Sequence, residues 1–246
     1  SFERKTLKHL NEAIEYHDKI PEKIQVRKAE IEPLAHNAWA DAREKKDFSI
    51  FKPLLEEQVN IAIEQAHCIG FEDHPYDALM QRFEPGETVN SLKKLFDILK
   101  VGLGDILKET SKVKKPDKSF LYNRYPIDKQ IEFSTKIANK FGYDFERGRL
   151  DSTVHPFEIS FTRDDVRITT RYYENFINPS LFGTLHEAGH GIYEQNISEE
   201  FTRTAMTTDF LSFYAVGGVS FGAHESQSRL YENHIGRSKI FWENHF

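Results

Sequence analysis

The sequence predicts a mainly α-helical fold with a small antiparallel β-hairpin or sheet beside the helix that carries the chemistry. Three observations predict this fold class. Apolar residues recur at intervals of three and four over most of the 246 residues. Apolar and polar residues alternate strictly only between residues 155 and 170, as strands require. Helical spacing then returns after residue 180.

The N-terminal part of the chain is expected to form long amphipathic helices. The first 46 residues have helical periodicity, and we expect Pro21 and Pro33 to act as breakers. Asp47 begins the next helix, and Gly70 stands where a glycine ends a helix. The segments that follow are a short helix over 76–83, a turn at 84–86, a helix from 88 through 103, a polar loop at 112–118 and a helix over 127–141.

The alternating segment predicts a β-hairpin with strands at 155–162 and 166–170. Successive side chains of a strand point to opposite faces, so Arg167, Thr169 and Arg171 share one face of the second strand. Two arginines would then point the same way.

Beyond the hairpin, helices are expected over 181–195 and 217–246, with a long connection or lid over 196–216.

The composition argues against several classes of partner. The formal net charge is −6, and Lys and Arg are scattered among Asp and Glu, so nucleic-acid binding is not expected. No apolar run approaches the roughly 20 residues that cross a bilayer, so a membrane is not expected either. Cys68 is the only cysteine, which leaves no intramolecular disulfide and favours a reducing compartment. We therefore expect a cytoplasmic location.

The segment from His186 to His190 reads H-E-A-G-H. Positions four apart lie on one face of an α-helix, so His186 and His190 can direct imidazole nitrogens at one ion. Glu187 is offset by one residue, where its carboxylate can act as a general base on a water molecule. The simpler alternative is a helix with two surface histidines and a solvated glutamate.

A catalytic zinc ion usually has three protein ligands and one open position. Glu225 lies on a predicted downstream helix and would complete a His₂Glu set. His224 is the rival ligand, but it lies about 100° around that helix from Glu225, so both are not expected to bind one ion. The spacing favours metal-assisted hydrolysis.

Four ordered motifs resemble those of the carboxypeptidase Taq (M32) metallocarboxypeptidases. They are His155-Pro156-Phe157, Asp165-Val166-Arg167-Ile168-Thr169, the H-E-A-G-H segment, and His224-Glu225-Ser226-Gln227. The resemblance covers most of the chain. It implies a helical metallopeptidase fold with a deep groove, one divalent ion per chain (zinc, with cobalt as an option), homodimers, and removal of C-terminal residues from peptide substrates.

The resemblance also implies residue roles: metal ligands His186, His190 and Glu225; catalytic base Glu187; substrate-binding residues Arg167, Asp165, Thr169, His155 and His224. Arg167 is a candidate for the peptide's terminal carboxylate, because a guanidinium pairs with a carboxylate in bidentate fashion. A salt bridge with Asp164 or Asp165 is an equal alternative. For His155 and His224, a structural hydrogen bond is an equal alternative to a substrate contact.

The chain also departs from the family pattern. The family is roughly twice as long and has two further motifs, I-R-x-x-A-D and G-x-x-Q-D-x-H-W, that do not occur here. The stretch 201–216 looks longer than usual and lacks an expected Pro-Leu-Gly, so the lid is expected to differ or to be mobile. We expect residues 1–246 to be a single catalytic-domain fragment lacking both ends, with a helical wall over 1–150 and the metal-site core over 151–246.

The expected function is that of a metal-dependent carboxypeptidase with Glu187 as general base. The choice of an exopeptidase rests on the resemblance, because residue spacing does not distinguish terminal from internal cleavage. The alternatives are an endopeptidase or oligopeptidase of similar helical fold, and a catalytically incomplete metal-binding fragment. We expect weak or absent activity for these 246 residues alone.

Overall fold

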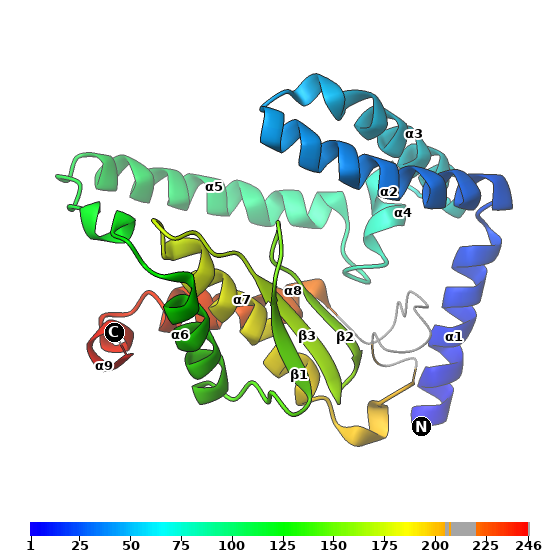
Figure 1. Cartoon of the computed structure of the whole chain (residues 1–246). Coiled ribbons are helices and arrows are strands. Elements are labelled where there is room, and N and C mark those ends of the chain that lie inside the picture. The colour runs from blue at the N-terminus through cyan, green and yellow to red at the C-terminus, as the bar shows by residue number, and fades with distance from the viewer. Residues whose placement is uncertain (205–206, 208–219, 246) are drawn as a thin grey trace. The chain divides into compact units, whose positions relative to one another are not determined.

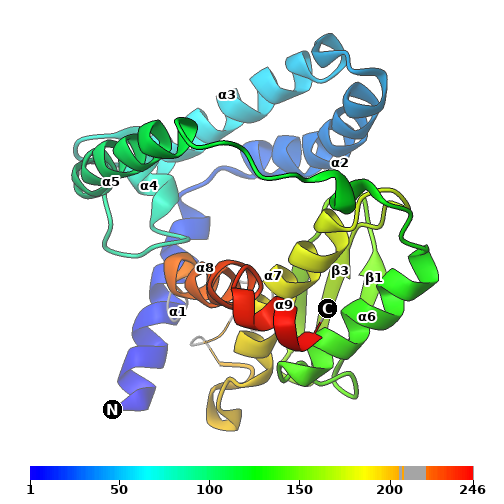
Figure 2. The same cartoon turned by 90° about the vertical axis from the view of Figure 1, so that its left-hand side faces the viewer.

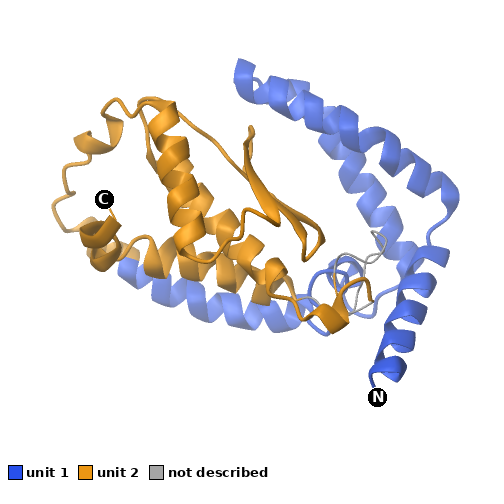
Figure 3. Ribbon diagram, turned by 60° about the horizontal axis from the view of Figure 1, so that its bottom comes forward, with its two compact units in different colours: residues 1–106 blue, residues 107–246 orange. Residues whose placement is uncertain are grey.

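The computed structural model describes residues 1–204, 207 and 220–245 (Figure 1). The chain divides into two compact units, residues 1–106 and 107–246 (Figure 3). The expected single catalytic domain, with a helical wall over 1–150 and a metal-site core over 151–246, stays a prediction. The expected lid over 196–216 lies largely outside the described residues. Within the described part of the chain, no helix is both long and apolar enough to cross a membrane.

The first unit is built from helices. They are α1 (Phe2–Asp18), α2 (Glu22–Lys45), a 3₁₀ turn (Phe48–Ile50), α3 (Lys52–Ile69), α4 (Pro75–Met80) and most of α5 (Val89–Ser111). Helix α3 packs against α2 and α4, and the core of the unit is formed by Tyr16, Ile20, Ile24 and Ile61. Gly70 follows α3 with φ +91°, a conformation that glycine adopts without strain, so the predicted helix end is confirmed.

The prediction that Pro33 breaks the second helix is wrong, because α2 runs through it. Proline removes one helical hydrogen bond and leaves the carbonyl four residues earlier, that of Ala29, without its partner. Pro33 is exposed, so water can satisfy that carbonyl and the helix continues.

The second unit combines a small sheet with helices. Its regular elements are a 3₁₀ turn (Ser119–Tyr122), α6 (Ile127–Lys140), β1 (Gly148–Ser152), β2 (Glu158–Thr162), β3 (Asp165–Thr170), α7 (Asn178–Gln195), a 3₁₀ turn (Glu199–Phe201), α8 (Phe221–Arg229), a π-helical segment (Leu230–Ile235) and α9 (Lys239–His245). The predicted antiparallel hairpin of β2 and β3 is confirmed. The sheet has the order β1-β3-β2, and β1, which runs parallel to β3, is absent from the sequence prediction.

Helix α7 is the centre of this unit. It packs on β3 and β2 and also contacts α6, α8 and the π-helical segment, and Figure 2 shows it between the sheet and α8. The strand residues Val166 and Ile168 are fully buried against Ala188 and Ile192 of the helix. Buried side chains along most of α7 therefore fix the orientation of the H-E-A-G-H segment.

Candidate metal centre and active site

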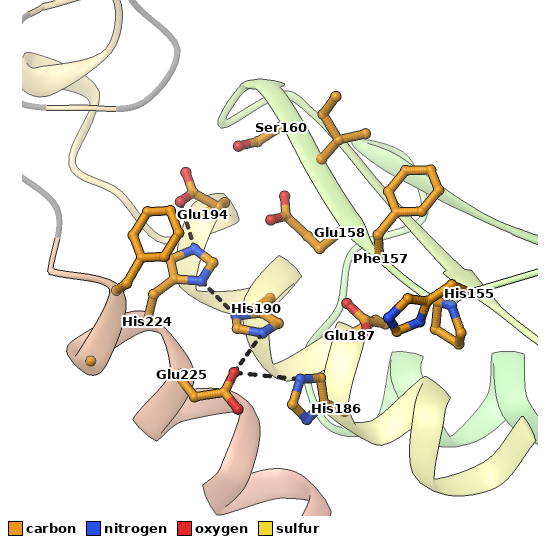
Figure 4. A pocket seen from close by; sticks show the side chains of 14 residues that line it. His155, Phe157, Glu158, Ser160, His186, Glu187, His190, Glu194, His224 and Glu225 are labelled. Atoms are coloured by element: carbon orange, nitrogen blue, oxygen red, sulfur yellow. Dashed lines mark hydrogen bonds and ion pairs between the residues drawn. The ribbon is translucent and has the colours of Figure 1, made fainter. Parts of the chain in front are cut away.

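The structure brings His186, His190 and Glu225 together (Figure 4). The two histidines are one turn apart on α7, and their ring centroids are 4.9 Å apart. Oε2 of Glu225, on α8, lies 3.5 Å from Nε2 of His186 and 3.2 Å from Nε2 of His190. One possible ligand atom of each residue thus lies within 4.8 Å of the other two.

Glycine in α7 allows α8 to approach this closely. A Cβ atom on Gly189 would lie 2.6 Å from Cα of Ser228 and 3.0 Å from the carbonyl oxygen of Gln227, both on α8. A Cβ on Gly191 would collide with the ring of Tyr143 at 2.7 Å. The two glycines of the motif helix are therefore explained by close packing, and the contact at Gly189 places Glu225 opposite the histidines.

The donor set fits a tetrahedral divalent ion. Bonds of about 2.0–2.2 Å to such an ion separate neighbouring ligand atoms by roughly 3.3–3.6 Å. The N–O separations of 3.2 and 3.5 Å agree with this spacing. Two imidazoles and one carboxylate are also the ligand types of catalytic zinc sites.

The electrostatics keep these groups in the forms that bind a cation. Burial, followed by the neighbouring His224 and His186, lowers the pKa of His190 to about 4, so its ring is neutral. Burial would raise the pKa of Glu225, but hydrogen bonds from Arg229 and Ser228 outweigh it and hold that pKa below its usual value. Glu225 is therefore an anion at neutral pH.

Glu187 lies between the two histidines in sequence and is only 7% exposed. Burial, followed by the nearby carboxylates of Glu225 and Glu232, raises the pKa of Glu187 to about 7. A carboxyl group with a pKa near neutrality can both accept and return a proton, which general acid–base catalysis requires.

A cavity of about 810 Å³ lies over this cluster (Figure 4). Besides the three clustered residues and Glu187, its lining includes His155, Phe157, Glu158, Ser160, Glu194 and His224. The predicted substrate residues His155 and His224 thus face the same cavity as the cluster. Their role in binding substrate stays a prediction.

The other predicted substrate residues do not line this cavity. The Arg167 guanidinium donates to both carboxylate oxygens of Asp165, at 2.8 and 2.9 Å, and lies 5.1 Å from the ring centre of Phe161. This is one of the two alternatives that the sequence left open for Arg167. The hydroxyl of Thr169 bonds to both backbone polar groups of Phe157 and so anchors the start of β2. The substrate-binding roles of these three residues stay predictions.

Three glutamates at the site, Glu158, Glu194 and Glu232, were missed by the sequence reasoning. Glu158 and Ser160 lie across from Ile168 and Val166 in the hairpin register, so the polar face of β2 points towards α7. Burial, followed by Glu194 and Glu187, raises the pKa of Glu158 to about 8. Strand alternation puts Glu158 and Ser160 on the face opposite the apolar Ile159, and in the structure the polar face is the more buried one while Ile159 is exposed.

The whole chain is similar to proteins of one known family. A family model described as carboxypeptidase Taq (M32) metallopeptidase matches residues 1–246. Carboxypeptidase 1 of Bacillus subtilis is 42% identical over 240 residues, and thermostable carboxypeptidase 1 of Thermus thermophilus is 42% identical over 237 residues. These alignments cover 97% and 92% of this chain and 46% and 45% of the two relatives.

Solved structures agree with these matches. The crystal structure of BsuCP matches this chain with a TM-score of 0.88 at 42% identity, and the structure of Pyrococcus furiosus carboxypeptidase with a TM-score of 0.82 at 36% identity. They cover 97% and 98% of this chain, and 46% and 48% of the matched chains.

The fold and the His-His-Glu cluster define a helical metallopeptidase architecture. The chain belongs to the carboxypeptidase Taq (M32) family of metallopeptidases. Membership in this family implies a divalent metal ion, and the residues of the cluster are able to hold one. The chain spans somewhat less than half the length of the curated relatives it matches.

Proposed function

We propose that the whole protein is a metal-dependent carboxypeptidase that removes C-terminal residues from peptides. The observation that carries this proposal is the convergence of two imidazole nitrogens on Glu225, beside the buried Glu187 and open to a cavity. The family and the names of its relatives support the choice of peptide substrate and of C-terminal cleavage.

His186, His190 and Glu225 would hold one ion per chain, which we propose is zinc, with cobalt as an alternative. A bound ion of this kind lowers the pKa of a water molecule and polarises the carbonyl of the peptide bond. The neutral ring of His190 and the ionised Glu225 suit this role, because metal ligands must be deprotonated.

Glu187 provides the proton transfers. Its carboxylate accepts a proton from the attacking water, and the resulting carboxylic acid then donates that proton to the nitrogen of the leaving amino acid. A pKa of about 7 suits both steps, because neither protonation state of Glu187 is then strongly favoured at neutral pH. Its burial also limits exchange of this proton with bulk water.

We further propose that Arg167 binds the terminal carboxylate of the peptide, with Asp165 and Thr169 beside it in the groove. Arg167 already holds a carboxylate in bidentate fashion, that of Asp165, so the peptide would have to displace this pair. His155 is proposed to contact the substrate from the cavity wall. His224 also faces the cavity, but both of its ring nitrogens have protein partners, which favours the structural hydrogen bond over a substrate contact. The cytoplasmic location, the homodimer and the division of the domain at residue 150 are proposals of the same kind.

A peptide and its C-terminal amide test the reaction type. The whole protein should release the last residue of the free acid and leave the amide uncut. Cleavage of both at equal rates would contradict the exopeptidase assignment and favour an endopeptidase or oligopeptidase. Absence of any hydrolysis, with the ion bound, would indicate a metal-binding protein without catalytic function.

A further inference from the structure

Each histidine of the cluster has a partner on the side of its ring that faces away from Glu225. For His186 this partner is a carboxylate, because Nδ1 lies 3.0 Å from Oε2 of Glu232. Glu232 belongs to the π-helical segment after α8 and is held there by Arg237 at 2.9 Å and Arg229 at 3.2 Å. π-Helical turns are rare and occur frequently at functional sites.

For His190 the partner is a second histidine. Nδ1 of His190 lies 2.5 Å from Nδ1 of His224, whose Nε2 lies 2.7 Å from Oε1 of Glu194. Glu194 is only 3% exposed. Figure 4 shows these contacts as a continuous chain from Glu194 through His224 to His190 and Glu225.

When an ion occupies the cluster, these contacts determine which ring nitrogens carry protons. A carboxylate accepts hydrogen bonds and does not donate them, so Nδ1 of His186 and Nε2 of His224 must both be N–H donors. In a neutral ring the other nitrogen is an acceptor, so Nδ1 of His224 accepts from the N–H at Nδ1 of His190. With an ion bound, both α7 histidines are then protonated at Nδ1, which leaves both Nε2 lone pairs, on the side of Glu225, for the ion.

We propose that Glu232 and the Glu194–His224 pair are positioning residues that hold His186 and His190 in the tautomer and ring orientation required for metal binding. This inference rests on the metal site of the proposed function. It assigns His224 a structural hydrogen bond to a ligand, which is one of the two alternatives left open by the sequence. Outer hydrogen-bond partners of this type orient a ligand and raise its basicity.

Zinc affinity of the whole protein, measured by competition with a chelator, tests this assignment. Glu232→Gln and Glu194→Gln keep the size of each side chain but remove the carboxylate. Each variant should bind zinc about 10- to 100-fold more weakly than the unmutated protein. Glu243→Gln is the matched control, because Glu243 forms its ion pair with Lys239 on α9 and not with a residue of the cluster. The zinc affinity of this variant should equal that of the unmutated protein.

Imidazole ¹⁵N NMR of the unmutated, zinc-loaded protein is a second measurement that does not depend on how the variants fold. It should show His186 and His190 protonated at Nδ1 and His224 at Nε2. Protonation of either α7 histidine at Nε2 would overturn the inference.

The outcomes separate this inference from the proposed function. Tight zinc binding that is unchanged in both Glu232→Gln and Glu194→Gln would overturn the positioning role and leave the metal site standing. An unmutated protein that binds no zinc would overturn the metal site and the positioning role together.

Discussion

Gly189 on α7 and Ser228 on α8 are in such close contact that a Cβ atom on the glycine would lie 2.6 Å from Cα of the serine. Glu225 precedes Ser228 by about one helical turn and receives a hydrogen bond of 3.0 Å from its hydroxyl. The separation of the two helices at Gly189 therefore sets the distance between Glu225 and the two histidines.

Gly189→Ala should push α8 away from α7. We expect a loss of roughly 1–3 kcal/mol in the free energy of unfolding from overpacking, and weaker zinc binding because Glu225 moves with α8. Gly102→Ala is the matched control. Gly102 also lies in a helix, but a Cβ atom there would meet nothing within 4 Å. This change should therefore increase the free energy of unfolding, by no more than about 1 kcal/mol. Denaturant unfolding and zinc titration measure both effects. Unchanged zinc affinity in Gly189→Ala would contradict the role given to this contact.

Glu187→Gln should separate metal binding from catalysis. The amide cannot accept a proton from water, so we expect turnover of a peptide substrate to fall by about 10²- to 10⁴-fold. Zinc affinity should stay within a few-fold of that of the unmutated protein, because Glu187 is not among the three clustered residues. Steady-state kinetics and metal analysis on the same preparation test this. Substantial remaining turnover would rule out Glu187 as the base.

Glu158 should make stability depend on pH in the metal-free protein. Its pKa is raised to about 8 in the folded chain from an ordinary value of 4.5, so the folded state binds one more proton than the unfolded state between these two values. The contribution of Glu158 to stability is therefore greatest below about pH 4.5 and falls as the pH rises towards 8, by at most about 1.4 kcal/mol per pH unit.

Glu158→Gln removes this titration. The difference in unfolding free energy between the variant and the unmutated protein should grow in favour of the variant from pH 4.5 to 8 and be constant above that range. Denaturant unfolding at several pH values measures it. A difference that is independent of pH would show that Glu158 is not a buried, protonated carboxyl group.

Arg167 and Asp165 should have opposite effects on substrate binding. If Arg167 binds the terminal carboxylate, Arg167→Ala should raise KM for peptides by about 10- to 100-fold. Asp165→Asn removes the competing carboxylate and should lower KM. Arg149→Ala is the matched control, because Arg149 pairs with Asp151 in the same way and lies beside Arg167 in the β1–β3 register. Equal effects of the two arginine variants would count against a specific role for Arg167.

The sequence predicted the helices well because their stability depends on local spacing. Amphipathic periodicity and Gly70 give the bounds of α3 to within a few residues, and the alternation of residues in the hairpin predicts β2 and β3. Strand β1 has no such pattern: Gly148–Ser152 reads G-R-L-D-S, and its partner β3 lies beyond β2 in the chain. Parallel pairing across a connection of this kind leaves no short-range signal.

The cluster on α7 was predictable because helical geometry alone relates His186 to His190. Glu232 was not, because its contact with His186 depends on how the π-helical segment packs against α7, 46 residues along the chain. The same holds for Glu194, which reaches His224 only because Gly189 lets the helices come together. Contacts of this type follow from tertiary packing and have no fixed spacing in the sequence.

Zinc binding by the whole protein and by its Glu225→Ala variant tests the central claim most directly. Metal analysis and chelator competition should find one zinc ion per chain in the unmutated protein. Glu225→Ala should bind zinc much more weakly, because it leaves two histidines where a catalytic zinc needs three protein ligands. A Glu225→Ala variant that binds one ion as tightly as the unmutated protein would contradict the assignment of Glu225 as a metal ligand.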